Sequence, residues 1–321
     1  MEYRKRFAHT PSAALPQCHA PTLAERPDGA LVCAWYAGAY ERAKDVAIYG
    51  AVLALDAAGW SERVVFADTP GFSEGNPVLF LFPDGRLWLF YVTMFGDRWD
   101  TCQVKYTHSH DGGWTWEGTV LLSSEWGWMT GCKPSLQPDG AILLPLYEER
   151  GRAFVLRSDD GGRQWTQSNI ITTEYGVIQP TLAALPDGRL LMYLRTCEAQ
   201  GGTIWQSLSQ DGGRIWSDPS RVVLPNPNAR VDLVRLASGR LALAFNDTGQ
   251  GRTPLTLALS EDEGASWPYR YDVEIDAGEY SYPALIQARD GMLQLAYTWR
   301  RTHIAHIACD EEWILHNARP L

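Results

Sequence analysis

The chain has 321 residues and a formal net charge of −10, and it contains no run of lysine or arginine. This balance disfavours nucleic acid and anionic membrane surfaces as partners. No apolar stretch is long enough to span a bilayer, and the first residues lack the apolar segment of a signal peptide, so we expect a cytoplasmic protein.

The six cysteines are scattered without the Cys-x-x-Cys spacing of a zinc site. They are Cys18, Cys33, Cys102, Cys132, Cys197 and Cys309. We therefore expect free thiols rather than disulfides, and neither a metal nor another cofactor. The oligomeric state does not follow from the sequence.

The predicted elements begin with a strand at residues 2–7, and a first repeat of four strands follows. Its first two strands flank an Asp-Gly turn that ends at Gly29, which is a strong hairpin signal. A third strand is expected over 46–52 and a short fourth strand over 61–66. Equivalent turns recur along the whole chain at Gly85, Gly140, Gly188, Gly239 and Gly291.

A second motif, Ser-x-Asp-x-Gly-x-x-Trp, follows the third strand of four repeats. The copies start at Ser109, Ser158, Ser209 and Ser260. In this motif, called the Asp box below, the aspartate can accept backbone N–H bonds of a tight turn, and the tryptophan can bury its ring. Degenerate copies stand at 55–60 and 310–313. The constant period indicates a repeat architecture.

Six repeats of four strands, without long helical periodicity, predict an all-β fold. We expect a six-bladed β-propeller of four-stranded antiparallel blades with Asp-box turns. The last repeat has three good strands, so the strand at 2–7 is expected to complete its blade and close the ring. We see no linker, and therefore predict a single domain over 1–321.

The inner strands of a propeller meet at one axis, and five of the six begin with a proline. These are Pro21, Pro77, Pro134, Pro180 and Pro283. The polar residues at these entries are His19, Asn76, Lys133, Gln179, Arg230, Asp232 and Tyr282. So many hydrogen-bonding side chains in a concave mouth predict a ligand site. The alternative is that strand ends are polar merely because they are solvated.

The Asp boxes, the six repeats and the proline-led strands resemble the sialidase (neuraminidase) superfamily of Asp-box, or BNR-repeat, propellers, over essentially the whole chain. Retaining sialidases bind the substrate carboxylate with three arginines and use an aspartate acid/base and a tyrosine nucleophile assisted by a glutamate. The resemblance implies that Arg195 and Arg252 are two of the arginines. It also implies Asp45 as the acid/base and Tyr282 as the nucleophile.

Three positions depart from the family pattern. The Arg-Ile-Pro motif of the family reads His19-Ala20-Pro21 here, the assisting glutamate aligns with Gln179, and an arginine-orienting glutamate aligns with Thr298. An imidazole cannot grip a carboxylate through two parallel bonds, and an amide cannot accept the tyrosine proton. His19 is the best candidate for the missing base because its pKa is ordinarily near neutrality.

Several interpretations stay open for these residues. Weaker candidates for the base are His303, His306 and Glu148, while Glu41 rivals Asp45 and Tyr280 neighbours Tyr282. Arg195 and Arg252 can instead pair with neighbouring carboxylates, Asp45 can be a loop cap, His19 can be structural, and Tyr282 can line the mouth without reacting.

The resemblance and its departures lead to three hypotheses about function. The first is a sialidase-like glycoside hydrolase acting on a terminal acidic sugar of a glycan, other than ordinary sialic acid. The second is a propeller-type polysaccharide lyase in which His19 and Tyr282 remove and return protons on a uronic acid. The third is a glycan- or protein-binding propeller without catalysis.

Overall fold

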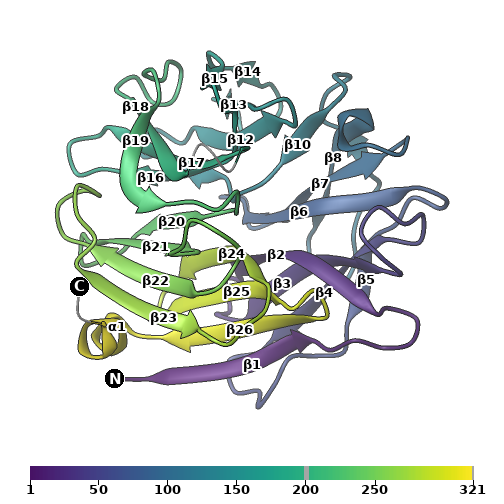
Figure 1. Cartoon of the computed structure of the whole chain (residues 1–321). Helices are drawn as coiled ribbons and strands as arrows, with labels where there is room; N and C mark the ends of the chain where they lie inside the picture. The colour runs from purple at the N-terminus through teal and green to yellow at the C-terminus, as the bar shows by residue number, and fades with distance from the viewer. Residues whose placement is uncertain (199–201, 320–321) are drawn as a thin grey trace. The chain divides into compact units, whose positions relative to one another are not determined.

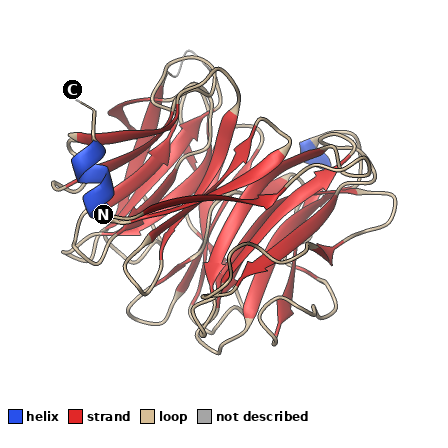
Figure 2. Cartoon of the chain, turned by 90° about the horizontal axis from the view of Figure 1, so that it is seen from below, coloured by secondary structure: helices blue, strands red, loops and turns tan. Residues whose placement is uncertain are grey.

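The structure is a computed structural model that describes residues 1–198 and 202–319. Strands are the main secondary structure of the described residues, and one α-helix, α1 (Glu311–Asn317), lies close to the carboxyl terminus (Figure 2). A 3-10 turn, η1, spans Trp99–Thr101. Among the described residues, no helix has the length and apolar character needed to cross a membrane.

The strands form six antiparallel sheets (Figure 1). The first two are β2 (Gln17–Glu25), β3 (Leu31–Gly38), β4 (Ala47–Leu53) and β5 (Val64–Ala67), then β6 (Ser73–Leu81), β7 (Leu87–Met94), β8 (Cys102–Ser109) and β9 (Val120–Leu121). The third contains β10 (Trp128–Thr130), β12 (Ile142–Glu148), β13 (Arg152–Ser158) and β14 (Thr166–Gln167), with two short strands, β11 (Ser135–Leu136) and β15 (Ile171–Thr172).

The other three sheets have the same four-stranded order. They are β16 (Val177–Ala184), β17 (Leu190–Thr196), β18 (Thr203–Ser209) and β19 (Ser220–Pro225); β20 (Asp232–Arg235), β21 (Leu241–Phe245), β22 (Leu255–Ser260) and β23 (Tyr269–Glu274); and β24 (Tyr280–Gln287), β25 (Leu293–Trp299), β26 (His303–Cys309) and β1 (Tyr3–His9). Six such blades are the predicted six-bladed β-propeller.

The described chain falls into two compact units. The first unit contains residues 1–130 and 282–311, and the second contains residues 131–281 and 312–321. Each unit has its own buried apolar residues, with Trp35 part of a cluster in the first unit and Trp267 part of a cluster in the second. That the whole chain is a single domain stays a prediction.

The amino-terminal strand completes the last sheet, as predicted. β1 pairs antiparallel with β26, with Tyr3 opposite Cys309, and the two strands run side by side in Figure 1. The backbone N–H of Glu2 also donates to the Asp310 carboxylate. This pairing covers the edge that β26 would otherwise expose.

Both repeated turns form as the sequence predicts. The six glycines of the hairpin turns, five of them after an aspartate and Gly239 after a serine, all have φ between 82° and 93°, a region that favours glycine. In the first Asp box, Asp111 Oδ1 accepts the backbone N–H groups of Trp114 and Thr115 at 3.0 and 2.9 Å. Of the four Asp-box tryptophans, Trp216 and Trp267 are buried, and the other two are half-buried.

Two local predictions are wrong. The fourth strand of the first repeat begins at Val64 rather than at residue 61, because Ser61 instead closes a turn through its bonds with the backbone of Val52. The degenerate Asp box at 310–313 contributes to helix α1, in which the side chain of Trp313 lies edge-on to Tyr271.

Candidate functional site

Four inner-strand residues adopt a strained backbone conformation immediately before a proline. Ala20, Asn76, Gln179 and Tyr282 have φ of 53°, 44°, 51° and 55°, and none is a glycine. In β2, β6 and β16 the strand pairing shifts its register at these positions. Left-handed conformations at non-glycine residues cost about 1–3 kcal/mol each and concentrate at functional sites. The strain therefore marks the same strand entries that the sequence singles out.

Side chains of neighbouring strands hold these bulges in place. Thr298 Oγ1 accepts the backbone N–H of Ala20 at 3.1 Å, and Thr130 Oγ1 donates to the backbone carbonyl of Asn76 at 2.6 Å. Thr298 occupies the position at which the resemblance expects a glutamate. Here its hydroxyl group fixes the backbone next to His19.

His19 and Tyr282 lie against each other in the first unit. Their ring centroids are 4.1 Å apart at an interplanar angle of 55°, and the ring of Tyr36 lies 5.7 Å from that of His19. The His19 side chain is buried, whereas Tyr282 is only half-buried. The structure thus brings together the two residues that were expected to provide the base and the nucleophile.

A buried tyrosine and an ion pair complete this cluster. Burial raises the pKa of Tyr36 well above its usual value, and the neighbouring charge of Glu41 and a hydrogen bond to Glu41 add to the rise. Glu41 also forms an ion pair with Arg301. Tyr36 is therefore a neutral hydroxyl at ordinary pH, and Glu41 is engaged by two partners.

Asp45 lies in the loop between β3 and β4 and is exposed. Its Oδ2 accepts the backbone N–H of Ala39 at 3.0 Å, which is the loop-cap role considered from the sequence. The same carboxylate lines a cavity of about 530 Å³ together with Arg42, Lys44 and Phe95. Asp45 therefore has access to a cavity, whereas its rival Glu41 is committed to an ion pair.

Two neutral side chains bond to Arg195 in the second unit. Its Nη1 donates to Gln179 Oε1 at 2.8 Å and its Nε to Asn228 Oδ1 at 2.7 Å, and the side chain is buried. Gln179 in turn donates to the hydroxyl of Tyr147 at 3.3 Å. Amide oxygens orient a guanidinium without carrying a charge that offsets its own. This geometry suits an arginine that binds an anionic group.

Arg252 is oriented differently. Its Nη1 lies 3.0 Å from Oε1 of Glu279, and the Ser281 hydroxyl donates to the same carboxylate oxygen. The backbone carbonyl of Arg252 accepts the N–H of Tyr280. The pairing with a carboxylate that the sequence left open is therefore present for this arginine.

Lys133 and Asp232 form an ion pair in the second unit. The Lys133 Nζ lies 2.7 Å from Asp232 Oδ1, which also accepts the Thr181 hydroxyl at 2.7 Å, and Asp232 is buried. Arg230 is buried as well, and it interacts with the thiol of Cys132. These three predicted binding residues satisfy one another or their neighbours, which favours a structural role.

The weaker candidates for the base have other partners. His306 lies 2.9 Å from Gln294 Oε1 and edge-on to Trp60, and burial lowers its pKa to about 3. The ring of His303 contacts Phe7, and burial lowers its pKa too. Glu148 forms an ion pair with Arg152.

All six cysteines are free thiols, as expected.

Several residues that contact the candidate site residues are not part of any motif in the sequence. They are Tyr36, Asn228, Glu279 and Arg301. Asn228 and Arg301 adopt left-handed conformations, with φ of 60° and 61°, in loops outside the repeated motifs. Only folding brings them to Arg195 and to Glu41, so a motif search does not find them.

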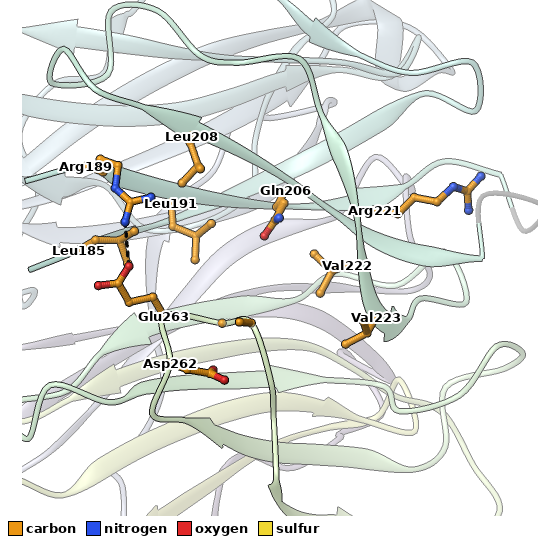
Figure 3. Close-up of a pocket in the computed structure, with 12 residues that line it drawn as sticks. Leu185, Arg189, Leu191, Gln206, Leu208, Arg221, Val222, Val223, Asp262 and Glu263 are labelled. Atoms are coloured by element: carbon orange, nitrogen blue, oxygen red, sulfur yellow. Dashed lines mark hydrogen bonds and ion pairs between the residues drawn. The ribbon is translucent and has the colours of Figure 1, made fainter. Parts of the chain in front are cut away.

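A second hollow lies on an Asp box rather than at the candidate residues (Figure 3). It has a volume of about 270 Å³ and is lined by Arg189, Arg221 and Asp262 among others. Arg189 forms an ion pair with Glu263 at 2.8 Å across its wall. None of the predicted site residues lines it, so we do not assign the candidate chemistry to it.

Sialidases are among the known proteins that this chain resembles in sequence and fold. The chain is 23% identical to a sialidase of Bacteroides fragilis (strain YCH46) over 228 residues, which cover 64% of this chain and 41% of that protein. This chain thus spans less than half the length of that relative.

Two solved structures show the likeness of fold. The NanB sialidase from Streptococcus pneumoniae superposes with a TM-score of 0.82 at 14% identity, over 96% of this chain and 70% of that one. The intramolecular trans-sialidase from Ruminococcus gnavus gives 0.81 at 15% identity, over 98% and 97%. The family model of the BNR repeat-like domain matches residues 29–295, most of the sequence. The chain belongs to the BNR repeat-like domain family.

Proposed function

We propose that this protein is a sialidase-like glycoside hydrolase that removes a terminal acidic sugar, other than ordinary sialic acid, from a glycan. Arg195 carries the proposal, because its guanidinium is oriented by the neutral oxygens of Gln179 and Asn228. Guanidinium groups bind carboxylates through paired hydrogen bonds, and these two amide oxygens do not offset the positive charge of Arg195. Similarity to sialidases supports the reaction class.

In this proposal each residue has one chemical role. Arg195 and Arg252 bind the sugar carboxylate. Asp45 protonates the leaving oxygen as the glycosidic bond breaks, while the Tyr282 oxygen attacks the anomeric carbon or stabilises its developing positive charge. His19, whose ring contacts that of Tyr282, accepts the Tyr282 proton. Water then releases the sugar from Tyr282.

The substrate is expected to differ from ordinary sialic acid. Arg-Ile-Pro is replaced by His19-Ala20-Pro21, so one arginine of the family's carboxylate grip is missing at this position. Gln179 cannot accept the tyrosine proton, because an amide oxygen is a very weak base. We therefore propose an acidic sugar whose carboxylate is bound by Arg195 and Arg252 without a third arginine at residue 19.

A polysaccharide lyase is the second candidate, and the His19–Tyr282 contact favours it. In a lyase, one of the two groups removes the C5 proton of a uronic acid while the other protonates the leaving oxygen. The C4–O bond breaks and a C4–C5 double bond forms. The new double bond is conjugated with the carboxylate, so the unsaturated sugar absorbs ultraviolet light, whereas the saturated sugar acid released by hydrolysis has no such chromophore.

One assay separates the candidates. We would incubate the protein with aryl glycosides of uronic and ulosonic acids and with uronic-acid polysaccharides, and follow both aryl release and the absorbance of an unsaturated product. Aryl release that is lost in Tyr282→Phe and strongly reduced in Asp45→Asn supports the hydrolase. Unsaturated product lost in His19→Gln supports the lyase. Binding without turnover on the whole panel would contradict both and leave a glycan-binding propeller.

A further inference from the structure

The first Asp box brings two histidines and a glutamate together on the surface of the first unit. His108 is the penultimate residue of β8, His110 follows Ser109 in the Asp box, and Glu117 directly follows the tryptophan of that box. The Nε2 of His108 lies 2.7 Å from Glu117 Oε2, and the Nε2 of His110 lies 2.6 Å from Glu117 Oε1. Both imidazoles therefore point at one carboxylate.

The scaffold holds these three residues before any ligand arrives. The backbone N–H of Glu117 donates to the carbonyl of His108 at 2.9 Å, and its carbonyl accepts the hydroxyl of Thr107 at 2.8 Å. The ring of His108 is stacked on Trp88, with centroids 5.3 Å apart. Its side chain is 15% exposed, against 64% for His110, so one ligand is anchored and another is open to solvent.

The other Asp boxes show that this combination is not a general property of the turn. The third box has the backbone hydrogen bond that corresponds to the one between Glu117 and His108: the N–H of Ser217 donates to the carbonyl of Leu208 at 2.9 Å. The positions equivalent to His108, His110 and Glu117 are Arg157, Asp159 and Thr166 in the second box, Leu208, Gln210 and Ser217 in the third, and Leu259, Glu261 and Pro268 in the fourth. The turn fixes the geometry, and only the first box fills it with two imidazoles and a carboxylate.

We propose that His108, His110 and Glu117 form a binding site for a divalent transition metal of the zinc type, with a coordination position left for water. The donor atoms of the three residues lie within 4.8 Å of one another, so a small displacement of the exposed His110 brings all three within reach of one ion. Two imidazole nitrogens and a carboxylate oxygen suit Zn²⁺, Co²⁺ or Ni²⁺ better than Ca²⁺ or Mg²⁺, which prefer oxygen ligands. This site is separate from the residues of the proposed reaction.

The test is a calorimetric titration of the tag-free protein with Zn²⁺, alongside His110→Ala and Glu117→Gln. We expect one Zn²⁺ per chain, and a dissociation constant raised by at least about tenfold in each variant, because even indirect partners of metal ligands contribute that much. Co²⁺ in place of Zn²⁺ should give visible absorption that both variants lose. The circular dichroism of each variant, compared with that of the unmodified protein, checks that the fold is intact.

Two control variants keep the test decisive. His316→Ala removes an exposed histidine of α1, and it should leave Zn²⁺ binding unchanged. Cys197→Ser removes the one thiol that is not buried, and it should also have no effect. The proposal is wrong if the unmodified protein binds no Zn²⁺, if His110→Ala and Glu117→Gln bind as it does, or if Cys197→Ser abolishes binding.

Discussion

Arg195 donates a 2.8 Å hydrogen bond to Gln179, the residue that stands where the sialidase resemblance places a glutamate. Glutamine in place of this glutamate changes the surroundings of both the tyrosine and the arginine. It removes a base that could assist a tyrosine, and it leaves the guanidinium bonded to an amide that carries no charge. In this protein the position therefore serves the arginine.

Gln179→Glu should weaken the binding of acidic sugars rather than create a sialidase. A glutamate at this position would form a charge-assisted bond with Arg195 and compete with the carboxylate of the ligand. We expect negligible turnover of a simple aryl sialoside by both the unmodified protein and the variant. Turnover of the unmodified protein at an ordinary rate of about 1–10³ per second would show that the site is misassigned.

Arg195→Ala should raise the dissociation constant for an acidic sugar by roughly 10- to 150-fold, the equivalent of about 1.5–3 kcal/mol for a hydrogen bond to a charged group. Isothermal titration with a panel of uronic and ulosonic acids measures the change. Arg163→Ala, an exposed arginine of the second Asp box, is the matched control and should bind normally. Equal affinity of Arg195→Ala and the control would refute the carboxylate site.

Asp232→Ala should lower the free energy of unfolding by about 3–5 kcal/mol, because it removes one partner of a buried ion pair and leaves the Lys133 ammonium without it. Urea unfolding followed by fluorescence gives the value. The double variant Lys133→Met with Asp232→Leu replaces both charges by apolar groups and should recover much of this loss. A loss below about 0.5 kcal/mol for Asp232→Ala would mean that the pair contributes little.

Stability should fall as the pH drops from about 6.5 toward 3, partly because of His306. Burial lowers the pKa of this histidine to about 3 in the folded state, whereas an unfolded histidine titrates near 6.5. Between these values the unfolded chain binds a proton that the folded chain does not, so unfolding becomes more favourable as the pH decreases, by about 1.4 kcal/mol per pH unit.

The measurement for this prediction is urea unfolding of the unmodified protein and of His306→Gln at pH 7, 6 and 5. The variant keeps a side chain that can donate to Gln294 but loses the titration. Its stability should therefore fall less steeply with decreasing pH than that of the unmodified protein. Parallel slopes for the two proteins would exclude His306 as a contributor.

The sequence by itself determined the architecture, because the relevant interactions are local and repeated. A glycine after aspartate at a hairpin, or an aspartate that accepts N–H groups three and four residues ahead, depends on a few neighbouring residues. Because these local patterns recur at a constant period, they predict six blades. The last blade has an unpaired edge, which the amino-terminal strand covers. The prolines that were expected to begin the inner strands lie inside four of them instead, three or four residues after the first: Pro21 in β2, Pro77 in β6, Pro180 in β16 and Pro283 in β24.

The tertiary structure alone decided which polar residues act on which partners. Nothing in the sequence indicates that Arg195 bonds to Asn228, that Arg252 pairs with Glu279, or that Lys133 and Asp232 satisfy each other. These contacts join residues on different strands and loops, and they depend on register and on left-handed residues that no local pattern predicts. How strongly a charged side chain interacts with a ligand also depends on its burial and on whether its partner is neutral. Both are fixed only when the chain has folded.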